Sequence, residues 1–439
     1  METINEIRLW KYGKLSFGLA MFILLYVGTA LAQATYTVTD LGTLGGTFGL
    51  AYGINNRGWV DGFANLPGDT KQHAFLWQNG RKTDIPGAFG GPNSGAFAGP
   101  NERGQVVGQA ESATADPNGE DFCGYGTHLV CLPFVWQTGL MSPPLPLLVG
   151  GNNGAAFAIN ERGQAAGQSE IGTPDPTCGP APPPPFFIFL ETQAVIWKKG
   201  TVQPLATLPG DTQANALGIN DLGQAVGLSG DCFAFQGGLS HAVLWQNGTV
   251  TDLGSLGSPN NNLAHDINNL GQAVGFSDLA GDTAQHAFLW QNGVMTDLGA
   301  LPGDAGSFAP GINNRGQVTG GSFDASGNVR AFLWENGVMK DLNTLIPIDS
   351  PLYLLFAPDI NDLGEIVGTA FVVSGAQKGE VHAFLAAPTH GSTAGQSATL
   401  PSRGGSSERP KITLPENVRK LLQQQLRFGR FGARLTGVQ

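Results

Sequence analysis

The chain has 439 residues, of which 65 are glycine and only 13% are charged. This much glycine excludes a mostly helical protein, because each glycine inside a helix costs about 1 kcal/mol relative to alanine. The formal net charge of −11 excludes a chain that binds nucleic acid through a generally basic surface.

The N-terminal segment, residues 1–32, has the pattern of a secretory signal peptide. Three basic residues precede an apolar run that ends in Ala30-Leu31-Ala32, the small-residue pattern of a cleavage site. The run is short for a membrane-spanning helix, and an uncleaved anchor is the alternative interpretation. We therefore expect the mature chain, residues 33–439, to be secreted to an oxidising periplasmic or extracellular compartment.

The body of the chain is a sevenfold repeat. An Asn-x-[Arg or Leu]-Gly motif followed by a short alternating stretch recurs about every 51 residues. A second signature, His-Ala-Phe-Leu-Trp or a variant of it, follows each motif, and several units then have an Asn-Gly turn. The motif asparagines are Asn55, Asn101, Asn160, Asn220, Asn268, Asn313 and Asn361.

Each repeat predicts four short antiparallel β-strands. The Asn-Gly pair favours positive φ at two adjacent residues and therefore a tight hairpin between strands three and four. The Asn-x-x-Gly motif indicates a slightly longer hairpin between strands one and two, closed by an Asx-type turn. A four-stranded meander repeated at this period is typical of a β-propeller blade, and a β-solenoid is the alternative.

The two ends of the repeat array complement each other. The seventh unit ends after its third strand at Phe384-Leu385, whereas residues 36–42 form a strand with no preceding unit. We therefore expect an all-β, seven-bladed propeller over residues 33–386, in which the N-terminal strand completes the last blade. Such closure would remove the exposed sheet edge of an open array.

The connections between strands two and three, together with the blade-to-blade crossovers, are expected on one face. They are long in units two and three, at residues 109–131 and 168–192, and ten residues long in units one and five. Binding residues tend to lie on variable loops of a rigid scaffold, so we place the interaction face here.

All four cysteines, Cys123, Cys131, Cys178 and Cys232, fall in these connections. Four cysteines allow three pairings. We favour Cys123–Cys131 within unit two and Cys178–Cys232 between neighbouring blades, because neighbouring blades present equivalent loops side by side. No Cys-x-x-Cys element is present, so we expect disulfides rather than a zinc site.

Four Gly-Asp elements are the best candidates for ligand contacts. Their aspartates are Asp69, Asp211, Asp282 and Asp304, all in variable connections. Carboxylates here would hold Ca²⁺ or contact a hydroxylated ligand, and turn-forming aspartate is the alternative interpretation. The repeated histidines at the start of strand three are interpreted as structural. We assign no catalytic residue and no cofactor beyond that Ca²⁺.

The C-terminal tail differs from the repeats. Residues 387–410 are rich in Ser, Thr, Gly and Pro and predict a flexible linker to a basic tail at 411–439. Residues 403–439 contain eight basic residues and two glutamates, a net charge of +6. Because residues 1–32 have a net charge of +1 and the whole chain −11, residues 33–402 have a net charge of −18. The tail contains an apolar helical stripe formed by Val418, Leu421, Leu422 and Leu426. We expect such a helix to contact an anionic membrane surface or the acidic ring, and a solvated tail is the alternative.

The His73-Ala74-Phe75-Leu76-Trp77 signature, with Asp-Leu-Gly-x-Leu-Gly at 40–45 and the Gly-Ile-Asn element, resembles the HAF-repeat family of probable extracellular proteins. The resemblance covers about 350 residues, and units two and three depart from the His-Ala-Phe tripeptide. It implies export and a repeat architecture, and it supplies no catalytic residue.

Together these patterns predict an exported, monomeric propeller that acts as a non-enzymatic binding or scaffold protein at the cell envelope. Its partner would be a protein or a glycan, not nucleic acid. The first alternative is a polysaccharide hydrolase or lyase with carboxylates near the propeller axis, and the second is a purely structural envelope protein. Carboxylates with raised pKa values converging at the channel mouth would favour the enzyme.

Overall fold

The computed structural model describes residues 36–87, 89–178, 189–232, 234, 238–389 and 410–428, with helix side chains up to residue 422. The expected signal peptide at 1–32 and nearly all of the expected linker lie outside these residues. The chain divides into two units, Met1–Gln33 and Ala34–Gln439, and every described residue belongs to the second.

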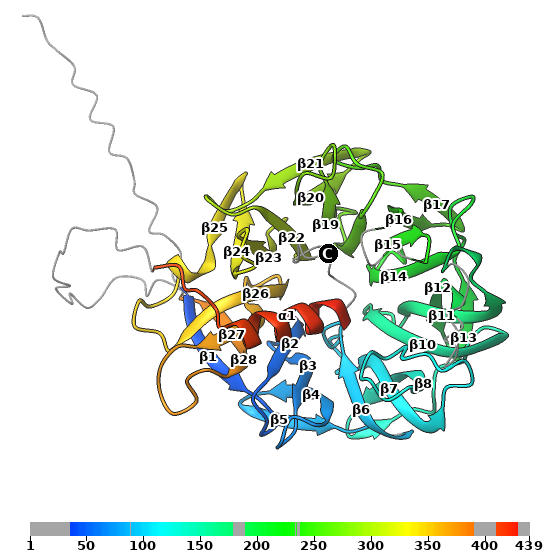
Figure 1. The fold of residues 1–439 in the computed structure, drawn as a ribbon, viewed down its shortest axis with the longest axis horizontal. Helices are drawn as coiled ribbons and strands as arrows, with labels where there is room; N and C mark the ends of the chain where they lie inside the picture. The colour runs from blue at the N-terminus through cyan, green and yellow to red at the C-terminus, as the bar shows by residue number, and fades with distance from the viewer. Residues whose placement is uncertain are drawn as a thin grey trace, which may run out of the picture. The chain divides into compact units, whose positions relative to one another are not determined.

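The second unit is all-β apart from two short 3-10 helices and one α-helix among the described residues, as the glycine content predicts. Its strands form successive groups of four antiparallel strands, numbered here 1 to 7, which follow one another around a common centre (Figure 1). A single parallel pair, Thr192 with Gln213, joins groups 3 and 4 into one eight-stranded sheet.

Groups 1 to 4 contain the first half of the strands. Group 1 consists of β2 (Gly49–Ile54), β3 (Val60–Asn65), β4 (Gln72–Gln78) and β5 (Arg81–Ile85). Group 2 consists of β6 (Gly90–Ala96), β7 (Val106–Ala115), β8 (Leu129–Gln137) and β9 (Leu140–Met141). Group 3 consists of β10 (Gly150–Ile159), β11 (Ala165–Pro174), β12 (Leu190–Lys198) and β13 (Thr201–Pro204), with η1 (Pro176–Cys178) between β11 and β12. Group 4 consists of β14 (Gln213–Ile219), β15 (Ala225–Gly230), β16 (Ser240–Gln246) and β17 (Thr249–Asp252).

Groups 5 to 7 contain the remaining strands. Group 5 consists of β18 (Leu263–Ile267), β19 (Ala273–Asp278), β20 (Gln285–Gln291) and β21 (Val294–Gly299). Group 6 consists of β22 (Gly306–Ile312), β23 (Val318–Phe323), β24 (Val329–Glu335) and β25 (Val338–Asp341), followed by η3 (Leu342–Thr344). Group 7 consists of β26 (Leu352–Ile360), β27 (Ile366–Val372), β28 (Val381–Pro388) and β1 (Tyr36–Gly42). The only α-helix among the described residues is α1 (Glu416–Phe428).

The turns have the local conformations that the motifs predict. Asn79 and Gly80, between β4 and β5, have φ angles of 49° and 82°, as a two-residue hairpin of type I′ requires. In the first hairpin, Oδ1 of Asn55 accepts the backbone N–H groups of Arg57 and Trp59, both at 3.0 Å, which confirms the Asx-type turn.

The strand β1 pairs antiparallel with β28, although the two are more than 330 residues apart in the chain. Asp40 on β1 lies 2.9 Å from Nδ1 of His382. In group 1 the equivalent histidine, His73, makes the same contact at 2.8 Å with Asp84 on that group's own fourth strand. The N-terminal strand therefore supplies group 7 with the partner that strand four supplies elsewhere.

The motif asparagines connect each group to the next. Nδ2 of Asn55 donates to the carbonyl oxygen of Asn101 at 3.2 Å, and Nδ2 of Asn361 donates to the carbonyl oxygen of Asn55 at 2.9 Å. The same bond joins every intervening pair: Asn101 to Asn160, Asn160 to Asn220, Asn220 to Asn268, Asn268 to Asn313 and Asn313 to Asn361. The hydrogen bonds thus run through all seven motifs and return to the first.

The apolar core lies between neighbouring groups. The phenylalanine of the His-Ala-Phe signature is fully buried in groups 1, 5 and 7, as Phe75, Phe288 and Phe384. Phe75 packs with Leu41 and Leu385 of group 7, so the signature residue fills the space between two groups.

Candidate binding site on the loop face

The loop face is defined here as the end of the strand groups that carries the connections between strands two and three and the crossovers between groups. The opposite end, with the hairpin turns between strands one and two and between strands three and four, is called the hairpin face. In groups 2 and 3 the connections of the loop face are shorter than predicted. Strands β7 and β11 continue to Ala115 and Pro174, where they pair with Leu129 and Leu190. The true connections are therefore 116–128 and 175–189, and the prediction of loops over 109–131 and 168–192 is corrected accordingly.

Two disulfides fix these connections, with the pairing that the sequence analysis favours. Cys123 in the β7–β8 connection is bonded to Cys131, which lies on β8 rather than in a loop. Cys178 in η1 of group 3 is bonded to Cys232, which follows β15 of group 4. Disulfides persist in oxidising compartments, so both bonds indicate such an environment for the chain.

Removing the two disulfides separately is expected to give unequal losses of stability. In the loop-entropy treatment, the bond that spans 54 residues contributes about 4 kcal/mol and the bond that spans 8 residues about 2.5 kcal/mol. A Cys178→Ser/Cys232→Ser chain should therefore unfold at lower urea concentration than a Cys123→Ser/Cys131→Ser chain. The reverse order in urea unfolding would contradict the larger contribution to stability expected of the Cys178–Cys232 disulfide.

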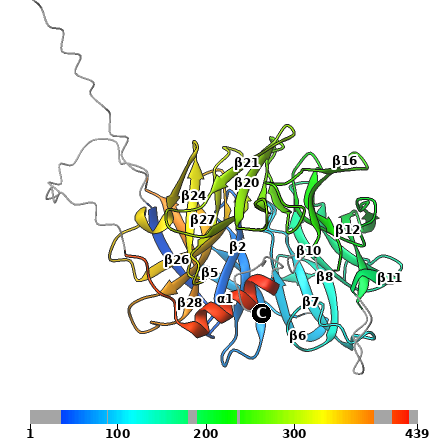
Figure 2. The ribbon, with the colours of Figure 1, turned by 45° about the horizontal axis from the view of Figure 1, so that its top comes forward.

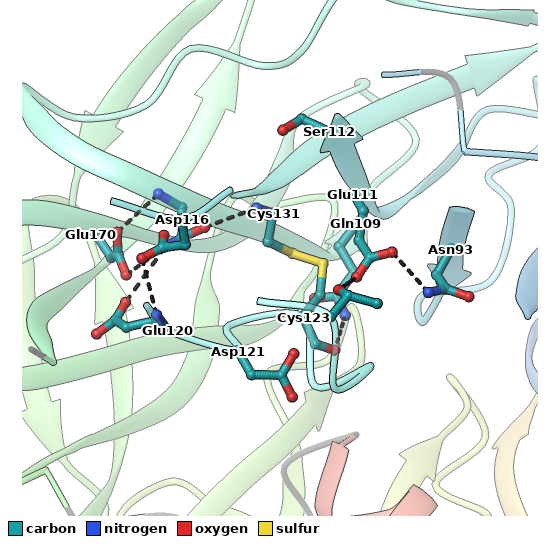
Figure 3. Close-up of a disulfide and its surroundings, with 12 residues drawn as sticks. Asn93, Gln109, Glu111, Ser112, Asp116, Glu120, Asp121, Cys123, Cys131 and Glu170 are labelled. Atoms are coloured by element: carbon teal, nitrogen blue, oxygen red, sulfur yellow. Dashed lines mark hydrogen bonds between the residues drawn. A yellow bond between two sulfur atoms is a disulfide. The ribbon is translucent and has the colours of Figure 1, made fainter. Parts of the chain in front are cut away.

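A cluster of buried carboxyl groups lies beside the Cys123–Cys131 bond (Figure 3). Asp116 and Glu120 come from the β7–β8 connection, and Glu170 comes from β11 of the neighbouring group; all three are 7% exposed or less. Nδ2 of Asn153 donates to Asp116 at 2.8 Å and to Glu170 at 3.0 Å. The backbone N–H of Leu190 donates to Glu120 at 3.1 Å. The cluster therefore ties the group 2 connection to both ends of the long connection in group 3.

The surroundings of this cluster favour the protonated form of Glu120. Burial, together with the neighbouring Glu170 carboxyl group, raises the pKa of Glu120 to about 10. Glu120 therefore keeps its proton at neutral pH. Glu120 and Glu170 are 50 positions apart in the chain, and no local spacing in the sequence marks them as a pair.

A second buried carboxyl group lies on the other side of the disulfide (Figure 3). Glu111 accepts hydrogen bonds from Nδ2 of Asn93 at 2.8 Å and from the hydroxyl group of Thr127. Burial raises the pKa of Glu111. Thr127 belongs to the β7–β8 connection, so this glutamate holds the far end of the same loop on the strands beneath it.

The four Gly-Asp carboxylates lie in four different connections, and their side chains bond to other segments of the chain. Asp69 accepts from the backbone N–H and the hydroxyl group of Thr47 at 2.8 and 2.9 Å. Asp211 accepts from the hydroxyl group of Ser229 at 2.6 Å, and Asp282 accepts from that of Ser258. The backbone N–H of each of the four aspartates closes a turn, as that of Asp69 does with the carbonyl oxygen of Leu66 at 3.0 Å. The structure does not bring the four residues together.

The fourth carboxylate, Asp304, holds the C-terminal tail. Its side chain is 1% exposed and forms ion pairs with Arg330 and with Nζ of Lys411, each at 3.0 Å. The backbone N–H of Leu414 donates to Oδ1 of Asn328 at 2.9 Å, and Arg419 donates to the carbonyl oxygen of Ser326 at 3.0 Å. Asn328 and Ser326 lie in the β23–β24 connection, so this part of the tail lies on the loop face.

The apolar stripe of the tail packs on the strand groups. Val418 and Leu422 of α1 are each 3% exposed and belong to the same core cluster as Phe48 and Tyr353. Figures 1 and 2 show α1 across one end of the strands. Among the described residues, no helix is both long enough and apolar enough to cross a membrane. Contact of the tail with a membrane surface stays a prediction, and it would require α1 to leave these partners.

A cavity of about 250 Å³ lies at the centre of the strand groups and opens toward the hairpin face. All seven groups contribute to its lining, and its rim consists of the residues that follow the motif asparagines: Asn56, Glu102, Glu161, Asp221, Asn269, Asn314 and Asp362. Each rim side chain accepts a backbone N–H from the equivalent residue of the preceding group. The rim is therefore a second continuous set of hydrogen bonds, parallel to that of the motif asparagines.

Two half-buried aspartates, Asp266 and Asp359, line this cavity. Burial raises the pKa of Asp266 to about 6 and that of Asp359 to about 8, with the neighbouring Asp266 adding to the second shift. Oδ2 of Asp359 accepts the N–H of Ile54 at 2.8 Å, and Oδ2 of Asp266 accepts that of Ile312 at 3.2 Å. The raised pKa values are those that the enzyme alternative requires. However, the carboxyl oxygens already accept backbone hydrogen bonds that join one strand group to the next.

One further set of potential metal ligands is present among the described residues. Asp175, Cys178 and Cys232 have ligand atoms within 4.8 Å of one another. Both sulfur atoms belong to a disulfide, so neither is a thiolate, which is the form that binds metals.

Comparisons with known proteins find similarity to solved structures at low sequence identity. No family model and no curated protein matches the sequence. An acylaminoacyl peptidase from Pyrococcus horikoshii is 11% identical with a TM-score of 0.45, over 79% of this chain and 53% of that one, so this chain spans about half its length. The β-propeller domain of the trilobed protease from Pyrococcus furiosus is 10% identical with a TM-score of 0.44, over 81% and 97% of the two chains. A six-bladed propeller lectin from Aleuria aurantia is 6% identical with a TM-score of 0.32, over 60% and 77%. The arrangement of four-stranded antiparallel groups in this chain is that of a β-propeller protein.

Proposed function

We propose that this protein is an exported, non-enzymatic binding or scaffold protein of the cell envelope, of the HAF-repeat type. It is built on a closed seven-bladed propeller and binds a protein or glycan through the loop face. The pairing of β1 with β28 and the asparagine hydrogen bonds that return from Asn361 to Asn55 support the closed ring of seven blades.

The observation that carries the binding function is the fixation of the described parts of the connections in groups 2 to 4, residues 116–128, 175–178 and 231–232. The two disulfides and the carboxyl cluster of Asp116, Glu120 and Glu170 hold these segments on the neighbouring strands. A surface that is ordered before binding pays less conformational entropy when a partner binds. The net charge of −18 over residues 33–402 favours a cationic partner.

The test is binding of the purified mature chain to a glycan array and to a panel of cationic peptides, with Glu191→Lys as the variant. Glu191 is the second residue of β12, directly after the group 3 connection, and is half-buried. We expect reversal of this charge to weaken binding about tenfold. Asp349→Lys makes the same charge change on an exposed connection before group 7 and should leave binding unchanged. Equal effects of the two variants would contradict a site at groups 2 to 4.

The second candidate function is polysaccharide hydrolysis or elimination at the axial cavity. The observation that favours it is the pair of raised pKa values of Asp266 and Asp359, since a general acid must stay protonated near neutral pH. Turnover of a polysaccharide by the mature chain, abolished in an Asp359→Asn variant, would replace the binding proposal by this one.

A further inference from the structure

A basic pocket lies on the hairpin face, between groups 2, 3 and 4. It has a volume of about 660 Å³ and is lined by Arg103 and Arg162 from two first hairpins, by Lys198 at the end of β12 and by Lys199 in the following turn. All four side chains are exposed, and no acidic side chain contributes to the lining. This concentration of cations contrasts with the net charge of −18 of residues 33–402.

The four cations are not neutralised by ion pairs. Among the described residues, no carboxylate lies within 4 Å of their charged nitrogens, whereas Arg57, the equivalent of Arg103 in group 1, pairs with Glu102 at 3.1 Å. Glu161 is near enough to Arg103 to interact electrostatically and accepts the backbone N–H of Glu102 at 2.9 Å, but it does not line the pocket. Four cations beside this one carboxylate leave the pocket with a net positive charge.

The side chain of Arg103 reaches the neighbouring strand group. Nη2 of Arg103 lies 2.9 Å from the position that a Cβ atom on Gly163 would occupy. The guanidinium group from group 2 therefore lies over the first hairpin of group 3, where Arg103 and Arg162 both line the pocket.

A second pocket in groups 5 and 6 provides a comparison. It is lined by Arg315, Gln317 and Glu335, among others, and has a volume of about 390 Å³. There Gln317 donates to the carboxylate of Glu335 at 3.0 Å, and Lys340 pairs with the same carboxylate at 2.9 Å. The last residue of strand three is thus an acid that neutralises the neighbouring cations.

In the basic pocket that acid is replaced by a cation. Lys198 occupies the position of Glu335, and Gln164 occupies that of Gln317. Oε1 of Gln164 accepts a hydrogen bond from Asn160 at 3.0 Å, so its amide N–H groups are the part of the side chain that remains for the pocket. In group 6, Gln317 and Lys340 bind the carboxylate of Glu335. In group 3 the equivalent position holds Lys198, so no carboxylate is present there for Gln164.

We propose that this pocket binds an anionic sugar, that is, a glycan unit that carries a carboxylate or sulfate group. Guanidinium groups match the planar, bidentate geometry of such anions, and the glutamine amides suit sugar hydroxyl groups. The volume lies in the range of small-ligand sites. The acidic ring repels an extended polyanion such as nucleic acid, so a compact anion is favoured. The site is on the face opposite to the one in the proposed function and does not depend on it.

The test is calorimetric titration of the mature chain with three probes: a trigalacturonate, a sulfated disaccharide and a neutral trisaccharide of the same size. We expect binding of the trigalacturonate or the sulfated disaccharide and a loss of about tenfold or more in affinity for Arg103→Gln/Arg162→Gln. Preference between the two anionic probes identifies the acidic group. The matched control, Arg315→Gln, changes the neutralised pocket and should leave the affinity unchanged.

Three results would overturn the proposal. The first is equal affinity of the double variant and the unmodified chain, with thermal unfolding showing that both are folded. The second is equal affinity for inorganic sulfate alone, and the third is tighter binding of a single-stranded oligonucleotide than of either anionic sugar.

Discussion

A mature chain that begins at Thr43 instead of Gln33 is expected to lose on the order of 5 kcal/mol of its free energy of unfolding. The deletion removes β1, and with it the burial of Tyr36 and Leu41, which are 3% and 8% exposed. It also removes Asp40, the partner of the fully buried His382. Each large apolar side chain accounts for about 1.5–3 kcal/mol, and the lost ladder hydrogen bonds add about 1 kcal/mol each.

Urea unfolding followed by tryptophan fluorescence measures this loss. The matched control is a chain that begins at Thr35, which lacks only Gln33 and Ala34 and keeps all of β1. The truncated chain should also associate, because the deletion leaves the edge of β28 unpaired. Identical urea midpoints for the two chains would show that β1 does not hold group 7 in place.

The hairpins and the four-strand repeat could be predicted from the sequence because their determinants are local. A pair such as Asn79-Gly80 needs positive φ at both residues, and few other turns satisfy that requirement. The disulfide between Cys178 and Cys232 was also predictable, because equivalent loops of neighbouring repeats lie side by side. The partner of β1 followed from the missing strand of the seventh unit.

The parts that the sequence analysis missed depend on contacts between distant residues. Asn153 joins Asp116 to Glu170, and nothing in the spacing of these three residues indicates that they meet. The docking of Val418 on the strand groups was one of the two contacts expected for the tail helix, but its partners depend on tertiary packing and could not be named. One signal was available: Asp266 and Asp359 stand where most other copies of the motif have glycine, a departure that marks them as unusual.

The conformational stability of the chain is expected to fall as the pH rises from about 6.5 to about 8, and Asp359 is a main cause. Its pKa is about 8 in the folded chain and near 3.8 when it is exposed by unfolding. The folded state therefore holds a proton that the unfolded state has lost, so the stabilisation is complete below pH 3.8 and disappears as the pH passes through 8. Over the 1.5 pH units above 6.5, this loss amounts to roughly 2 kcal/mol.

Below pH 6.5 the neighbouring His265 changes the free energy of unfolding in the opposite direction to Asp359. The effect of Asp359 is therefore separable only above that pH. Burial lowers the pKa of His265 to about 3 from 6.5, so stability rises with pH over that interval and offsets the effect of Asp359. Asp266 acts in the same direction as Asp359, but its pKa of about 6 places its effect below pH 6.5. Glu120 contributes to the fall above pH 6.5, and it is unchanged when only Asp359 is replaced.

An Asp359→Asn variant should therefore show a shallower fall of unfolding free energy between pH 6.5 and 8 than the unmodified chain. The amide oxygen keeps the hydrogen bond from Ile54, while the contact with the N–H of Ile360 is weakened. A uniform loss of about 1 kcal/mol is expected from that change at every pH, so the slope and not the absolute value is the measurement. Asp349→Asn, at an exposed position, is the control and should keep the unmodified slope. If Asp359→Asn keeps it too, Asp359 is not the group whose proton stabilises the folded chain in this pH range.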